Sequence, residues 1–316
     1  MELTLHQITG HQPGPHLLIT GGVHGDEFEP MAAIRQLIGL IRAELLCGRV
    51  TLVPVVNEPA FRLGRRTAED GLDLARTCPG RPDGSVTERI AHALSSLIRS
   101  ADYYIDLHTG GTRLRVLPLV GYMLHPDAAL LNVQRQMAHA FGLPIIWGTD
   151  PNLNGRSLSV ARDANVPAIY AEYHGGGGCD QLGVEAYVRG CIQVMAHLAM
   201  ITAPDPHSTS RPAAAPIVIE DGRPESGHMQ INHPAPCEGF FEPAVTLGQF
   251  AEKGQVLGSV SDLLGAKRVP IQAAHAGIVL VLHTFARVDD GASVAVILET
   301  SGQESGLARS PAILDS

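Results

Sequence analysis

The stretch His16-Leu17-Leu18-Ile19-Thr20-Gly21-Gly22-Val23-His24-Gly25-Asp26-Glu27 decides the fold of this chain. It opens with an apolar run typical of a buried strand, and the two glycines after the run allow close approach of the backbone. His24 and Glu27 are three residues apart, so both side chains can point at one ion if a turn begins between them. The stretch therefore predicts a strand whose end carries two candidate metal ligands.

A second apolar run, Tyr103-Tyr104-Ile105-Asp106-Leu107, ends in the same way, with His108 directly after it. Ligands and catalytic groups collect beyond the strand ends of open α/β sheets. Two imidazoles and a carboxylate, with a fourth position left for water, form the ligand set of catalytic zinc. Asp106, two residues before His108, is placed to hydrogen-bond to a metal-binding side chain and so to fix its orientation. With 15 histidines and 32 acidic residues in the chain, the spacing alone leaves the ordinary interpretations open: a helix-capping loop histidine and a polar strand end.

Composition narrows the class of protein. The 316 residues carry a formal net charge of −9, which argues against nucleic acid or an anionic membrane as a partner. No apolar run approaches the roughly 20 residues that span a bilayer, and the first residues do not resemble a signal peptide. Five widely spaced cysteines favour reduced thiols in the cytoplasm. The length suits two domains, and a homo-oligomer is left open.

Strand-like and helix-like segments alternate up to about residue 201, which predicts a largely parallel sheet covered by helices on both faces. Further strands are expected at 50–56, 115–123, 144–147 and 167–173. Helices are expected at 29–46, 85–99, 126–141 and 181–200, the second opened by the capping box Ser85-Val86-Thr87-Glu88.

The second part of the chain differs in pattern. A stretch rich in proline and alanine predicts a linker at 204–216 between a catalytic domain at 1–203 and an all-β domain at 217–300. Short strands separated by glycines replace the helical periodicity, at 239–241, 256–260, 268–271, 277–283 and 293–298. The polar tail at 301–316 is expected to be loose.

Ordered motifs across the chain resemble the succinylglutamate desuccinylase/aspartoacylase family, zinc amidohydrolases related to the carboxypeptidase A clan. The matching landmarks are Gly22-Val23-His24-Gly25-Asp26-Glu27, Asn57 with Pro59-Ala60-Phe61, Arg66, Asp73-Leu74-Ala75-Arg76, Asp106-Leu107-His108-Thr109-Gly110 and Ala171-Glu172-Tyr173. The resemblance implies a three-layer α/β/α zinc-peptidase-like domain with a mostly parallel sheet, and a small lipoyl-like β domain. It also implies one Zn²⁺ per chain, held by His24, Glu27 and His108.

Amide hydrolysis needs an activated water, a stabilised oxyanion and a proton for the leaving amine. Glu172 ends a buried-looking strand, and the resemblance implies that it is the general base; the plainer interpretation is a glutamate that leaves the sheet for solvent. Arg66 lies where the family polarises the scissile carbonyl, although Arg62 and Arg65 compete for the assignment. Arg76 lies where the family clamps a substrate carboxylate, a task that suits its fork of donors.

One departure concerns the tetrapeptide that is usually Asp-Leu-Asn-Arg in this family. Here it reads Asp73-Leu74-Ala75-Arg76, so an amide that would help to hold the carboxylate is missing. Asp73 and Asn57 are expected on the substrate-binding side of the site. A turn-forming asparagine before Pro59 is an equally ordinary interpretation of Asn57.

The leading function is a zinc-dependent deacylase or deacetylase that releases an amine from a small N-acyl amino acid. One alternative is a zinc carboxypeptidase that acts on short peptides. An alternative of another class is a lipoyl-like carrier or binding protein without catalysis. Carrier domains modify a lysine within Asp-Lys-Ala or Met-Lys-Met, and the stretch around Lys267 contains neither. The acyl group and the amine stay open.

Overall fold

The computed structural model describes residues 2–202, 215–229 and 232–299. The proposed loose tail and residues 204–214 of the proposed linker lie outside these ranges. The chain forms two compact units. The first comprises Met1–Thr109, Leu119–Glu172 and Cys179–Ser226, and the second comprises Gly110–Pro118, Tyr173–Gly178 and Gly227–Ser316.

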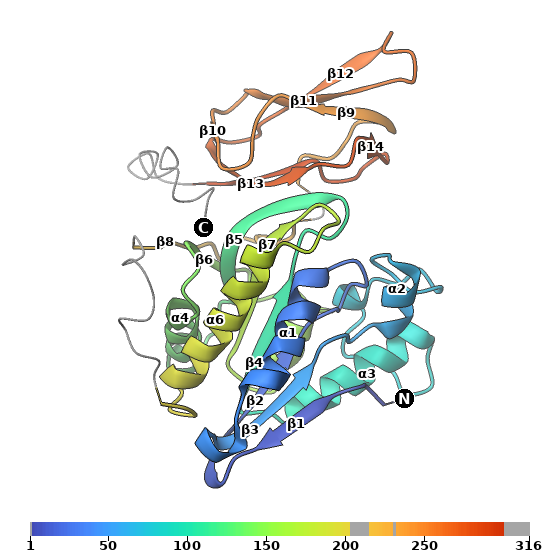
Figure 1. Cartoon of the computed structure of the whole chain (residues 1–316). Coiled ribbons are helices and arrows are strands. Elements are labelled where there is room, and N and C mark those ends of the chain that lie inside the picture. Colours follow the sequence, from blue (N-terminus) through green and yellow to red (C-terminus); the bar gives the residue numbers. More distant parts are fainter. Residues whose placement is uncertain (1, 203–214, 230–231, 300–316) are drawn as a thin grey trace. The chain divides into compact units, whose positions relative to one another are not determined.

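The sheet of the first unit has the strand order β1-β3-β2-β4-β7-β5-β6-β8 (Figure 1). Strand β1 pairs antiparallel with β3, whereas the pairs β2–β3, β2–β4, β4–β7, β5–β6 and β6–β8 are parallel. The mostly parallel sheet is therefore confirmed. The strands are β1 (His6–Thr9), β2 (Gln12–Thr20), β3 (Cys47–Val53), β4 (Tyr103–His108), β5 (Leu114–Met123), β6 (Ile145–Thr149), β7 (Ala168–Gly175) and β8 (Ile217–Glu220).

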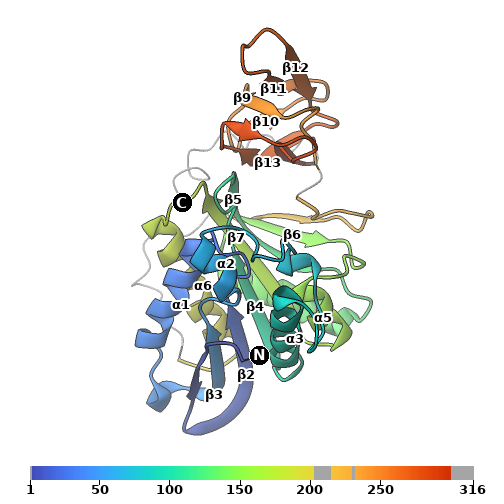
Figure 2. The same ribbon diagram turned by 90° about the vertical axis from the view of Figure 1, so that its right-hand side faces the viewer.

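Helices cover both faces of this sheet (Figure 2). Helix α6 packs against α1 and α4 on one side, and α3 packs against α5 on the other. The three-layer α/β/α arrangement is therefore confirmed. The helices are α1 (Phe28–Leu40), α2 (Glu58–Leu63), α3 (Val86–Arg99), α4 (Ala128–Phe141), α5 (Ser157–Asp163) and α6 (Gln181–His197), with short 3-10 turns at Ala43–Leu45 and Leu74–Arg76.

Local sequence explains several helix starts. The capping box predicted before α3 is present: Ser85 Oγ accepts from the Glu88 N–H, and the Glu88 carboxylate accepts from the Ser85 N–H. Asp127 and Asp180 cap α4 and α6 through their side chains.

Helix α1 ends at Leu40, six residues before the predicted end, and Ile41 takes an extended conformation. None of the described helices is long and apolar enough to cross a membrane.

The second unit is built from short strands. A four-stranded antiparallel sheet runs β12-β11-β9-β14, and β13 pairs with β10, β15 and the first residues of β5. Its core includes Phe241, Leu257 and Val279. The strands are β9 (Gly239–Pro243), β10 (Phe250–Ala251), β11 (Val256–Ser261), β12 (Arg268–Gln272), β13 (Gly277–His283), β14 (Arg287–Val288) and β15 (Ala295–Leu298). The expected small all-β unit is therefore present.

The division between the units differs from the boundaries expected from sequence. Strand β8 pairs with β6, so residues 217–226 extend the first unit instead of opening the second. The second unit also takes in residues 110–118 and 173–178, which follow His108 and Glu172 in the chain. Linear composition cannot reveal such an exchange, because it depends on which strands pair.

Candidate active site

Parallel strands bring the predicted site residues of the first unit to one sheet edge. In the register of β2 and β4, Thr20 lies opposite Asp106. In the register of β4 and β7, His108 lies opposite Glu172. The proposed base and a proposed metal ligand are therefore neighbours across two adjacent strands.

A tight approach of backbone shapes the turn that carries His24 and Glu27. A Cβ atom at Gly25 would lie 2.1 Å from the carbonyl carbon of Ala60, at the start of α2. Any larger residue would push this turn off α2. Asn57 caps α2 by accepting from the Ala60 N–H at 3.2 Å, and its own N–H donates to Gly22 O at 2.8 Å.

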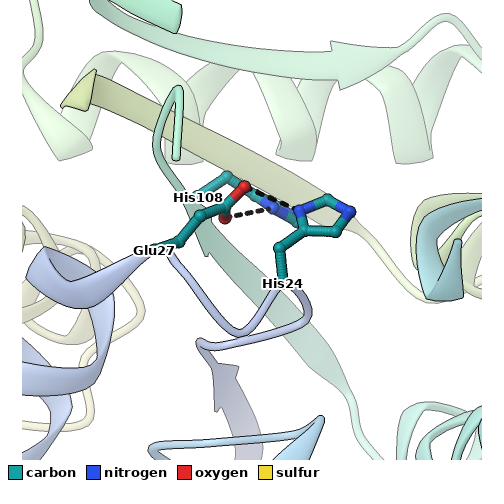
Figure 3. A group of neighbouring side chains, drawn as sticks. All are labelled: His24, Glu27 and His108. Carbon is teal, nitrogen blue, oxygen red and sulfur yellow. Dashed lines mark hydrogen bonds and ion pairs between the residues drawn. The ribbon is translucent and has the colours of Figure 1, made fainter. Parts of the chain in front are cut away.

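Three side chains converge at the end of β4 and in the turn that follows β2 (Figure 3). His24 Nδ1 lies 2.6 Å from Glu27 Oε1, and His108 Nδ1 lies 3.1 Å from Glu27 Oε2. One ligand atom from each residue falls within 4.8 Å of the others. His24 and Glu27 are buried and the His108 side chain is 12% exposed, so the group is largely shielded from water.

The far nitrogen of each histidine faces a second carboxylate. His108 Nε2 lies 3.1 Å from Asp106 Oδ2, and His24 Nε2 lies 3.0 Å from Asp73 Oδ1. Such partners fix the ring orientation and leave the Nδ1 atoms to face a common point. Asp106 is in turn held by the hydroxyls of Thr20, at 2.8 Å, and Ser157. Two Nδ1 donors and one carboxylate, each fixed from behind, fit a divalent transition metal of the zinc type.

The charges in this group stabilise one another. Burial alone would lower the pKa of His108, but the carboxylates of Asp106 and Glu27 outweigh it and raise the pKa well above 6.5. Burial likewise opposes the charge of Glu27, yet the two histidines hold the pKa of its carboxyl far below the usual range. Glu27 is therefore an ionised carboxylate, the form that binds a metal.

Glu172 lies on β7 in a different environment. Burial raises the pKa of its carboxyl to about 7, against the opposing effect of His108. Its Oε2 atom is buried and has no hydrogen-bond partner among the described residues. A carboxylate with an unused oxygen and a pKa near neutrality is suited to accept and return a proton.

The structure distinguishes the three neighbouring arginines. Arg62 is 77% exposed and pairs with Glu58, and Arg65 is also exposed. Arg66 turns inward: its Nη1 lies 3.9 Å from Glu27 Oε1, and its Nε and Nη2 donate to Asp73 Oδ2 at 3.2 and 3.0 Å. Of the three, Arg66 is therefore the one beside the His–Glu–His group.

Asp73 holds two parts of the site together. Its Oδ1 accepts from His24 and from the Ala75 N–H at 2.9 Å, and its Oδ2 accepts both bonds from Arg66. These donors occupy both oxygens. The contacts of Asp73 are those of a residue that positions His24 and Arg66, while its predicted contact with substrate stays a prediction.

Two half-buried guanidinium groups lie close together. Gly155 packs against the backbone of Arg76, since a Cβ atom there would lie 2.6 Å from Arg76 O, and this places Arg156 beside Arg76. Burial and the charge of Arg156 lower the pKa of Arg76 to about 10. Within the described ranges, no carboxylate forms an ion pair with either group. Two unpaired, partly desolvated guanidiniums create a site for an anion.

Sequence reasoning missed Arg156 and Tyr170. Arg156 precedes α5 in a polar loop without a recognisable motif. Tyr170 lies two residues before Glu172 on the same face of β7, and its ring occupies the space that a side chain at Gly121 would need. The alternation of side chains along β7, which puts Tyr170 and Glu172 on one face, was the signal that could have found Tyr170.

Asn57 is wholly buried, and its Nδ2 atom has no partner among the described residues.

Comparisons with known proteins identify the family of the chain. Residues 13–198 match the family model of the succinylglutamate desuccinylase/aspartoacylase catalytic domain. The chain is 33% identical over 297 residues to the N-alpha-acetyl-L-2,4-diaminobutyric acid deacetylase of Halomonas elongata, with 90% of this chain and 82% of that protein covered.

Solved structures give the same result. A succinylglutamate desuccinylase/aspartoacylase from Rhodobacter sphaeroides superposes with a TM-score of 0.83 and 29% identity, covering 95% of this chain and 90% of that one. The product-bound ectoine utilization protein EutE (DoeB) of Ruegeria pomeroyi gives 0.81 and 28%, covering 93% and 87%. The chain therefore belongs to the succinylglutamate desuccinylase/aspartoacylase family.

Proposed function

We propose that this protein is a zinc-dependent deacylase that hydrolyses the amide bond of a small N-acyl amino acid. The observation that carries the proposal is the buried group of His24, Glu27 and His108 with Glu172 opposite His108 in the strand register. Zinc bound there would polarise the substrate carbonyl and lower the pKa of the attacking water. The relative from Halomonas elongata, a deacetylase of an acetylated diamino acid, supports this reaction class.

The residues of the chain supply the remaining chemistry. Glu172 takes the proton of the water and returns it to the leaving nitrogen, so that the amine departs neutral. Arg66, oriented by Asp73, donates to the carbonyl oxygen as negative charge develops on it. Asp106 and Asp73 keep the two imidazoles in position throughout.

Substrate binding is assigned to the guanidiniums of Arg76 and Arg156, which together receive the carboxylate of the amino acid. Within the described ranges, the Arg76 guanidinium donates only to the carbonyl of Ala75, at 2.7 Å, so its remaining donors are available. In this shared site, Arg156 compensates for the carboxylate contact that is lost because Ala75 replaces the asparagine usual in the family. We place Asn57 behind the substrate side, where its backbone N–H supports the turn at Gly22 and its side-chain oxygen caps α2.

A substrate panel tests the proposal. Zinc-loaded protein is incubated with N-acetyl and N-succinyl amino acids and with short peptides, and the released amine is measured. We expect release from N-acetyl amino acids and no release from peptides with a free N-terminus. Cleavage of the peptides alone would instead identify a carboxypeptidase.

A further inference from the structure

The segment after β8 carries Glu225, whose backbone is fixed by hydrogen bonds and whose charge acts on the two guanidiniums. The Glu225 N–H donates to Asp150 Oδ2 at 2.9 Å, and the Asp150 N–H donates to Ser226 Oγ at 2.8 Å. Ser226 Oγ in turn donates to the carbonyl of Asp221 at 2.5 Å. These bonds fix the backbone of Glu225 against the end of β6.

The backbone of Glu225 is strained. Its φ angle is +68°, a left-handed conformation that is disfavoured for a residue with a Cβ atom. The surrounding bonds to Asp150 and Ser226 maintain this conformation. Strained positions of this kind cluster at active sites and ligand-binding clamps.

The charges around the two guanidiniums single out Glu225. Three carboxylates interact electrostatically with Arg156, those of Glu225, Asp73 and Asp150, and the first two also act on Arg76. Asp73 is occupied by His24, Arg66 and the backbone. Asp150 is occupied as well, because Oδ1 accepts twice from Asn152 and Oδ2 accepts from Glu225.

Glu225 differs from the other two. Its carboxylate is exposed and forms no hydrogen bond or ion pair within the described part of the chain. The region therefore presents two cationic groups and one free anionic group to a ligand. This pattern complements an amino acid that carries both a carboxylate and a second, positively charged group.

We propose that Glu225 binds the side-chain ammonium of the substrate and thereby selects N-acyl diamino acids over N-acyl dicarboxylic amino acids. The inference rests on the proposed function and deepens it by naming the charge of the substrate side chain. An acetylated aspartate or a succinylated glutamate carries only negative charge, which Glu225 repels. An N-acyl diamino acid satisfies both Arg76 with Arg156 and Glu225.

The test compares two substrates that differ in this charge. N-acetyl-2,4-diaminobutyrate carries the ammonium, and N-acetyl-2-aminobutyrate ends in a neutral methyl group. We expect the parent enzyme to prefer the charged substrate in kcat/KM by roughly 10- to 100-fold, the range for a charge-assisted bond. Glu225→Gln should remove most of this preference by lowering kcat/KM for the charged substrate.

The control variant is Glu44→Gln, an exposed glutamate in the 3-10 turn at Ala43–Leu45. It should keep the parent preference. Glu225→Lys should reverse the order and favour N-acetylaspartate over the charged diamino substrate. A preference that survives in Glu225→Gln would overturn the assignment.

Binding of the product amino acids separates this inference from the proposed function. Calorimetric titration with 2,4-diaminobutyrate and with 2-aminobutyrate requires no turnover. A parent protein that cleaves neither substrate would contradict the proposed function. In that case, loss of the binding preference in Glu225→Gln would still support the role of Glu225, and an unchanged binding preference would refute it.

Discussion

Each unit of the protein contains a close pair of histidines, and the two pairs differ in what their nitrogens contact. The ring centroids of His24 and His108 are 5.4 Å apart in the first unit, and those of His233 and His275 are 5.8 Å apart in the second. In the first pair the Nδ1 atoms meet Glu27 and the Nε2 atoms face carboxylates.

In the second pair, three of the four ring nitrogens contact the backbone, and the fourth, His275 Nδ1, lies 3.5 Å from Glu299 Oε1. His233 Nδ1 lies 3.1 Å from Ala295 O, and its Nε2 accepts from the Ala274 N–H at 3.0 Å. His275 Nε2 lies 3.0 Å from Ile297 O. A short distance between two histidine rings is therefore not sufficient to form a metal site. The partners of the ring nitrogens decide whether a lone pair remains for an ion.

The pKa values diverge in the same way. The pKa of His108 is raised by neighbouring carboxylates, whereas burial lowers the pKa of His233. The carboxylates around the first pair favour positive charge there, as expected of the proposed metal site. Burial favours the neutral form of His233 inside a small β core.

Removal of one histidine from each pair gives the largest expected contrast. His108→Ala should lose bound zinc and lose activity down to background, because only two ligands remain. His275→Ala should keep the zinc content of the parent, about one per chain. Elemental analysis of protein purified without chelators measures both. Equal zinc in the two variants would remove the distinction drawn between the pairs.

Glu172→Gln separates catalysis from metal binding. Glutamine keeps the size of the side chain but cannot take a proton from water, so kcat should fall by roughly 10²- to 10⁴-fold while zinc stays bound. In the parent, activity should fall as pH is lowered and the carboxyl becomes protonated. Steady-state kinetics with parallel zinc analysis gives the answer, and loss of zinc would make Glu172 a ligand instead.

Asp73→Asn tests whether the carboxylate behind His24 matters as much as the ring itself. We expect zinc affinity to fall by roughly 10- to 100-fold, the usual effect of removing such a partner. Competition with a chromophoric chelator measures this affinity without substrate. Asp70→Asn is the matched control, because Asp70 bonds to Thr87 and not to the site. Similar affinities in both variants would reject the positioning role.

The smallest expected effect is that of His233 on the pH dependence of the free energy of unfolding. Its pKa in the folded protein lies below that of the unfolded chain, so the unfolded state binds more protons between the two values. The free energy of unfolding should therefore rise with pH up to about 6.5 and then level off with respect to this group. Denaturation curves at pH 5.5 and 7.5 should differ less in His233→Gln than in the parent. An unchanged difference would exclude His233 as a contributor.

Much of the site could be predicted from sequence because its landmarks are local. His24, His108 and Glu172 each follow an apolar run that forms a strand, and parallel pairing brings such strand ends together. The fold class was predictable for the same reason, since alternating strands and helices favour one layered architecture.

The remaining features depend on contacts between distant segments. Which of three arginines turns inward depends on the end of α2 at Leu63 and the left-handed turn at Gly64 that follows it. The position of Arg156 beside Arg76 depends on packing at Gly155. The unit boundary depends on the pairing of β8 with β6. None of these has a periodic pattern in the sequence.

Gly25 has a consequence for protein engineering. Because the backbone of Ala60 fills the space where a side chain at position 25 would lie, the geometry of the two proposed ligands His24 and Glu27 is fixed by a helix more than thirty residues away in the chain. Directed evolution that adds a side chain at position 25 alone would create a clash with Ala60. Libraries aimed at a different metal preference would have to diversify the first turn of α2 together with the His24–Glu27 turn.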